Sequence, residues 1–181
     1  MEYRRLMKNP KYRPLYSNFY AKDIGRLAQG MMILSGGTNT IFFIPKKEVP
    51  ADRWRDVTYG RIVVNYTPEK SDPYRTRLTV GGNQVKCLVD CGTPTVNLLT
   101  VKLLPNRVIS TPNTKFITIN IKDFYRNTPM ARSEYMHLKL SDLPENVISH
   151  YNLEEKVTTD GWAYAEIKRG MYGLPHAGLI A

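Results

Sequence analysis

The chain has 181 residues, of which 42% are hydrophobic, so it is long enough and apolar enough to build one domain with a core. No apolar run approaches the roughly 20 residues of a membrane helix, and the basic N-terminus lacks the apolar stretch of a secretory signal, so we expect neither a membrane span nor a secretory signal. A net charge of +10, spread along the chain, predicts a folded basic surface and a polyanionic partner. Cys87 and Cys91 have no metal-spaced partners and predict free thiols in a reducing, intracellular compartment.

The first half of the chain predicts one short helix and several strands. Residues 1–20, rich in Tyr, Arg, Lys and Pro, predict an irregular or partly helical lead-in. Residues 21–29 predict a helix that buries Ile24, Leu27 and Ala28. Short apolar or β-rich runs bounded by loop residues predict strands at 41–44, 61–66, 75–80 and 84–90. The last two are predicted to form a hairpin through Gly81-Gly82-Asn83.

The second half predicts a helix, a buried strand and two further strands. Thr93-Pro94 is a typical helix start, and the helix is expected to end at Pro105-Asn106. Residues 115–121 predict a strand with buried alternate residues. Strands are predicted at 134–140 and 162–169, with a helix within 144–153 between them and a turn into a helix at 171–181. Together these elements predict an α+β fold with a mixed, largely antiparallel sheet and flanking helices.

Three segments stand out in order: the basic run RTRLTVGGN at 75–83, the segment FITINIKDFYRNTPM at 116–130, and KRGMYGLPHAG at 168–178. Their order and spacing resemble the reverse transcriptase domain of copia-type retrotransposons and related elements. The upstream runs EYRRLMKNP, GRLAQG, GTNTIFFIP and DVTYGRIVVNYTPEK resemble its lead-in and fingers. The resemblance covers nearly the whole chain, and its specificity comes from the combination of segments.

This resemblance implies an architecture and an ancestral activity. Residues 1–40 would be a lead-in with a short helix, 41–114 a fingers-like region, and 115–181 a partial palm truncated before the Asp-Asp hairpin. The implied activity is RNA-directed DNA synthesis from deoxynucleoside triphosphates with Mg²⁺. The implied partners are an RNA template and a DNA primer, and the chain would be part of a longer polyprotein.

The expected metal site is degenerate. Nucleotidyl transfer uses two Mg²⁺ ions, which require carboxylate oxygens. The family supplies one aspartate where this chain has Asn120, a neutral and weaker ligand, and two more from an Asp-Asp pair that this sequence lacks. We therefore expect a catalytically inactive chain that binds no Mg²⁺ by itself.

The nucleotide-binding positions match the family better. Tyr125 matches the aromatic residue that lies against the sugar of the incoming nucleotide. Asp123 and Phe124 match the turn whose backbone N–H groups face the triphosphate. Arg75 and Arg77, two apart on a strand, share one face and match the strand that contacts the phosphates. The plainer interpretations are a core aromatic residue for Tyr125 and a solvated strand face for the two arginines.

The C-terminal motif departs from the family at one position. Leu174-Pro175 matches the segment that packs behind nucleotide and template, but His176 stands where the family has Gln. A lone histidine is more often structural or exposed than catalytic. His176 is therefore a second departure at a functional position, on the template side.

Two other functions compete with the polymerase interpretation. The run VGGNQVKCLVDCGTPT is similar to the active-site turn of a retroviral-type aspartic protease, with Asp90 as the catalytic carboxylate. Cys91 replaces the usual Thr or Ser there, and the supporting apolar-apolar-Gly segment is not evident. The third interpretation is a non-catalytic fragment that binds nucleic acid through phosphate contacts, with a strong salt dependence.

Overall fold

The computed structural model describes residues 2–31, 34–85, 96–119, 121 and 123–180. The described helices are α1 (Tyr3–Met7), α2 (Arg13–Leu27), α3 (Leu98–Ser110), α4 (Glu145–His150) and α5 (Ala177–Ile180). The described strands are β1 (Gly30–Met31), β2 (Ser35–Gly36), β3 (Ile41–Ile44), β4 (Thr58–Tyr66), β5 (Tyr74–Val80), β6 (Pro129–Lys139) and β7 (Trp162–Arg169). Within these residues, no helix combines the length and apolar character needed to span a membrane.

Five of the strands form one mixed sheet in the order β3-β7-β6-β4-β5. The β4–β6 pair is parallel, and the other neighbours are antiparallel. Strand β5 is an edge strand joined to β4 by the loop 67–73, while β1 and β2 form a separate small pair. The predicted α+β class and the mixed, mostly antiparallel sheet are confirmed.

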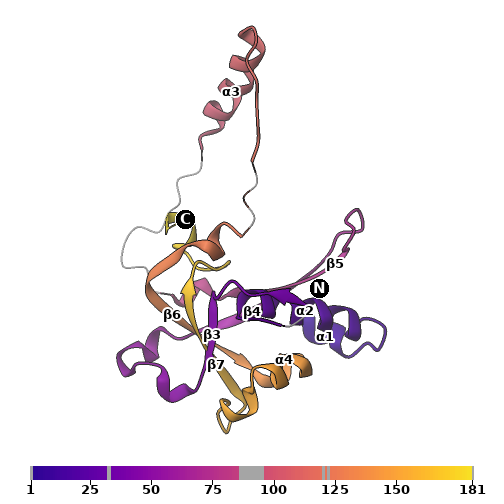
Figure 1. Ribbon diagram of the computed structural model, residues 1–181, viewed down its shortest axis with the longest axis vertical. Coiled ribbons are helices and arrows are strands. Elements are labelled where there is room, and N and C mark those ends of the chain that lie inside the picture. The colour runs from indigo at the N-terminus through magenta and orange to yellow at the C-terminus, as the bar shows by residue number, and fades with distance from the viewer. Residues whose placement is uncertain (1, 32–33, 86–95, 120, 122, 181) are drawn as a thin grey trace.

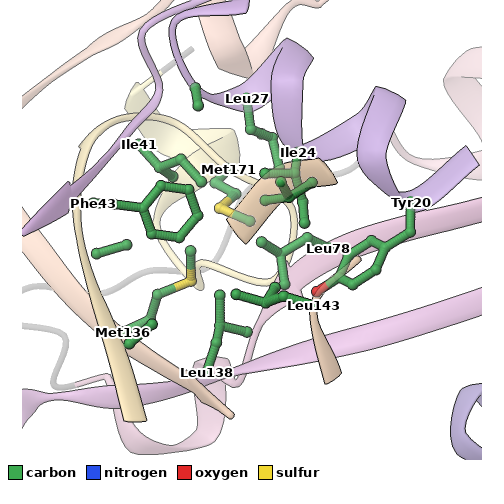
Figure 2. Packing of buried hydrophobic residues seen from close by; sticks show 14 of the residues in the cluster. Tyr20, Ile24, Leu27, Ile41, Phe43, Leu78, Met136, Leu138, Leu143 and Met171 are labelled. Atoms are coloured by element: carbon green, nitrogen blue, oxygen red, sulfur yellow. The ribbon is translucent and has the colours of Figure 1, made fainter. Parts of the chain in front are cut away.

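One face of this sheet carries the core. Along β7, Ala163, Ala165 and Ile167 are fully buried, as expected for alternate residues of a strand covered on one side. Helices α1, α2 and α4 cover that face, and α2 contributes the predicted Ile24 and Leu27. Figure 2 shows these side chains packed with residues of the sheet and with the C-terminal Met171. The core therefore joins the two ends of the chain.

The predicted helix at 21–29 is the last part of a longer one. Helix α2 begins at Arg13, and the lead-in also holds α1. The strands at 41–44 and 162–169 have the predicted bounds. These segments are apolar runs with clear loop residues on either side, so local pattern and tertiary packing agree.

The strand predicted at 115–121 is absent from the part of this segment that the structure describes. Residues 114–119 have no regular secondary structure, and Ile117 and Ile119 are 78% and 77% exposed. Figure 1 shows why: α3 and this segment project away from the sheet. An alternating apolar pattern becomes a strand only when a neighbouring strand takes up its backbone hydrogen bonds. No described strand pairs with residues 114–119.

Two further predictions need correction. Helix α3 begins after Asn97, whose side-chain carbonyl accepts a hydrogen bond from the Leu99 N–H at 2.8 Å, and it continues through Pro105 to Ser110. Strand β5 pairs with the preceding β4, and Gly82–Gln84 forms a 3-10 turn where the predicted hairpin would lead into its second strand. Residues 86–90 lie outside the described part of the chain, as do Cys87, Cys91, Thr93 and Pro94.

Candidate anion-binding pocket

A pocket of about 520 Å³ lies between α2, the β1–β2 pair, the edge strand β5 and the turn that contains Asp123. Its charged lining residues are the four cations Lys22, Arg26, Arg75 and Arg77 and the three carboxylates Asp23, Asp72 and Asp123. The predicted residues Arg75, Arg77 and Asp123 thus reach one site from segments far apart in the sequence.

Local geometry explains how the arginines are presented. In β5, Thr76 and Leu78 point into the core, so Arg75 and Arg77 point to the other side of the strand. Helix α2 provides an acceptor for a backbone N–H group of β5: the Leu78 N–H donates to Asp23 Oδ2 at 2.8 Å. The Thr76 hydroxyl donates to the carbonyl of Tyr16 at 3.2 Å. These bonds fix the distance between the helix and the two arginines.

A buried arginine links the two walls of the pocket. Arg126, with 5% of its side chain exposed, pairs with Asp23 at 3.1 Å and with Asp123 at 3.6 Å. Asp123 also pairs with Arg26. Two of the three carboxylates are therefore neutralised by arginines. In the described residues no carboxylate pairs with Lys22, Arg75 or Arg77, so the cavity keeps a positive balance.

The turn at Asp123 has an unusual backbone. Asp123 has a φ of 57°, in the left-handed region that non-glycine residues rarely adopt. Its carbonyl accepts the Asn127 N–H at 3.0 Å, and its carboxylate is held by Arg26 and Arg126. The surrounding ion pairs thus maintain a conformation that the chain alone disfavours.

The third motif docks on the same strand and turn. The Val80 N–H donates to the Tyr172 carbonyl at 2.9 Å, and the Gly170 N–H donates to the Thr128 carbonyl at 2.9 Å. The Tyr172 ring lies 5.5 Å from the guanidinium of Arg77 and packs edge-to-face on Tyr125, also at 5.5 Å. The C-terminal motif is therefore in contact with both of the other motif segments identified in the sequence.

The other predicted site residues lie outside the pocket lining. Phe124 is 42% exposed, and Tyr125 is half-buried and packs on the Tyr172 ring. His176 is half-buried, and no described side-chain contact joins it to the pocket. Asn120 and Asp90 lie outside the described residues, so neither the degenerate metal position nor the protease turn is placed.

Sequence reasoning missed the contribution of α2. Lys22 and Arg26 are four residues apart, which places both on one face of a helix. That spacing was a usable signal within the predicted helix. Arg126 had no comparable signal, because only the fold shows that a charged residue in the turn is buried.

The pocket does not fit the ligand set of a magnesium site. Among the described residues, no group of three or more His, Cys, Asp or Glu side chains is arranged to hold a metal ion. Asp23 and Asp123 are engaged by arginines, and Mg²⁺ requires oxygen ligands in octahedral geometry. The cavity suits an anion instead.

No protein-family model, curated protein or solved structure matches this chain.

Proposed function

We propose that this chain comprises the fingers and partial palm of a retrotransposon-type reverse transcriptase, and that its pocket binds the triphosphate of a deoxynucleotide without catalysing polymerisation. One observation carries the proposal. The basic strand and the Asp123 turn, which the family resemblance singles out, line a single cavity with Arg75, Arg77 and Asp123 in its wall. The C-terminal motif, the third segment of the resemblance, packs against both of them.

The charges of the pocket suit a polyphosphate. Lys22, Arg75 and Arg77 come from two elements and form no ion pair with a described carboxylate, and Asp72 in the same lining offsets only one of their three charges. Arginine presents several N–H donors in a fixed plane, which matches phosphate oxygens. The Tyr172 ring supports Arg77, and Tyr125 supports Tyr172. In this arrangement Tyr125 acts by positioning Tyr172 and Arg77, in addition to the sugar contact that the resemblance implies.

The lack of catalysis follows from the carboxylates. Asn120 cannot supply the charge of an aspartate, and the sequence contains no Asp-Asp pair. The carboxylates of Asp23 and Asp123 already neutralise Arg26 and Arg126. Because the described residues hold no carboxylate set for two metal ions, we expect the chain to bind a triphosphate without activating it.

A calorimetric titration tests the binding. dTTP, dTDP and thymidine are titrated in the presence of a chelator, and affinity is expected to fall with each phosphate removed. Arg75→Ala and Arg77→Ala should each weaken dTTP binding about 10-fold, the scale of a lost hydrogen bond to a charged group. Arg61→Ala, on the neighbouring strand and outside the pocket lining, is the matched control. Equal affinities for all four proteins would contradict the proposal.

Primer extension tests the lack of catalysis. With an RNA template, a DNA primer and Mg²⁺ or Mn²⁺, the chain should add no nucleotide. Asn120→Asp should not restore synthesis, because the Asp-Asp pair is still missing. Template-directed extension by the unmodified chain would overturn this part of the proposal while leaving the binding result intact.

A further inference from the structure

The face of the sheet opposite the core carries a row of aromatic side chains. Strand register places Tyr164 of β7 beside His137 of β6, and His137 beside Tyr59 of β4. All three side chains are half-exposed, whereas their sequence neighbours Ala163, Ala165 and Met136 are buried in the core. The row thus crosses three adjacent strands on the side away from the helices.

Both tryptophans of the chain extend this row. Trp162 packs edge-to-face on His137 with ring centroids 4.6 Å apart. Trp54, in the 3-10 turn Ala51–Asp56, is 40% exposed. Lys46 lies 4.8 Å from the Trp54 ring and 6.0 Å from the Tyr164 ring, so it connects the turn to the sheet. We call Tyr59, His137, Trp162, Tyr164 and Trp54 the aromatic face.

Two lysines border the aromatic face. Lys139 lies 5.3 Å from the Trp162 ring, and Lys46 lies 4.8 Å from the Trp54 ring. In the described part of the chain, neither lysine forms an ion pair with a carboxylate. The next row holds an acidic residue, Glu166, which pairs with Lys168 at 3.4 Å. The two lysines therefore place positive charge at two ends of the row, and Asp160 is a carboxylate within electrostatic range of Lys46.

The nucleotide pocket does not account for this surface. None of the five aromatic residues lines that pocket. The core does not need them either, because its packing uses the opposite face of the same strands. Half-exposed rings beside unpaired lysines combine the two features that bind single strands: stacking surfaces for bases and cations for phosphates.

We propose that the aromatic face binds single-stranded nucleic acid, with bases stacked on Trp54 and on the Tyr164 side of the row, and phosphates at Lys46 and Lys139. A duplex is not expected to bind there, because its bases hide their flat faces within the helix. Binding would be tolerant of sequence, since every base has such a face. The net charge of +10 favours the approach of any such polyanion.

Intrinsic fluorescence provides a direct test, because both tryptophans lie on the aromatic face. Oligo(dT) and oligo(U) should quench the emission as they bind. By anisotropy with a labelled oligonucleotide, Trp54→Ala and Tyr164→Ala should each weaken binding about 10-fold, within the range of one lost base stack. Trp54→Phe should retain most of the affinity, which separates stacking from folding effects, and circular dichroism checks each variant.

The control separates this site from the nucleotide pocket. The Arg75→Ala/Arg77→Ala double variant should bind the oligonucleotide as the unmodified chain does, although it loses dTTP. Oligonucleotide binding that leaves the emission unchanged, that is unaffected by Trp54→Ala and Tyr164→Ala, or that duplex DNA competes away equally well would overturn the proposal.

Discussion

Arg126 is the residue on which the geometry of the pocket depends most. It is 4% exposed, pairs with Asp23 and Asp123, and lies 5.9 Å from the Tyr172 ring. It therefore contacts two walls of the pocket, the helix and the turn, and also the C-terminal motif that packs against the turn. A buried charge of this kind is stable only while its partners remain in place.

Removing the charge of Arg126 should lower the stability of the folded chain. Arg126→Met keeps the length of the side chain but leaves Asp23 and Asp123 without their shared partner. We expect the free energy of unfolding in urea to fall by about 3 kcal/mol, the lower end for a broken buried pair. Arg4→Met, which breaks the exposed Arg4–Asp142 pair, should cost less than about 1 kcal/mol. Similar losses for the two variants would contradict the role of Arg126.

His137 should make stability depend on pH. Burial among the rings lowers the pKa of His137 below its ordinary value of 6.5. Above pH 6.5 the imidazole is neutral in both folded and unfolded chains. As the pH falls below 6.5, the unfolded chain takes up the proton first, so the free energy of unfolding decreases until the pH passes the lowered pKa of the folded state.

Urea denaturation at about pH 7.5 and about pH 5.5 measures this dependence. In His137→Phe, which keeps a ring against Trp162, the loss of stability between the two pH values should be smaller than in the unmodified chain. Carboxylates that titrate in the same range affect both proteins equally. An identical pH dependence for the two proteins would contradict the burial of a neutral His137.

At the scale of elements, the docking of the C-terminal motif on β5 depends on a glycine. Gly173 has a φ of 96°, and a Cβ there would lie 2.1 Å from the Val80 carbonyl oxygen. Gly161 has a similar φ of 81° but no atom within 4 Å of the equivalent position. The two glycines therefore differ in crowding and not in backbone conformation.

Comparing alanine substitutions at Gly161 and Gly173 measures the loss of stability caused by the crowded position of Gly173. Gly161→Ala should lower the free energy of unfolding by about 1 kcal/mol, the cost of a left-handed alanine. Gly173→Ala should cost clearly more, because the backbone must shift and the Tyr172–Val80 hydrogen bond is lost. Gly173→Ala should also weaken dTTP binding, whereas Gly161→Ala should not. Equal effects of the two substitutions on stability and binding would contradict this docking.

Some of these elements could be predicted from the sequence alone, and others could not. Strands β3 and β7 were predicted to the residue, because their apolar runs end at clear loop residues. The arginines of β5 were predicted correctly as a pair sharing one side of a strand. The strand predicted at 115–121 is absent from its described residues, because an alternating pattern needs a partner strand and no local pattern reveals one. The burial of Arg126 was not predicted, because it depends on contacts with α2, more than 100 residues away in the chain.

For the whole molecule, we propose that β5 and the Asp123 turn line one nucleotide site and that the C-terminal motif packs against both. Backbone amide NMR spectra of the isotope-labelled chain, recorded as dTTP is added, test it most directly. We predict that amide signals of Arg75 to Leu78, of the Asp123 turn and of the Tyr172 motif shift together, with one common binding curve. Shifts confined to one segment, or curves that differ between segments, would contradict the account.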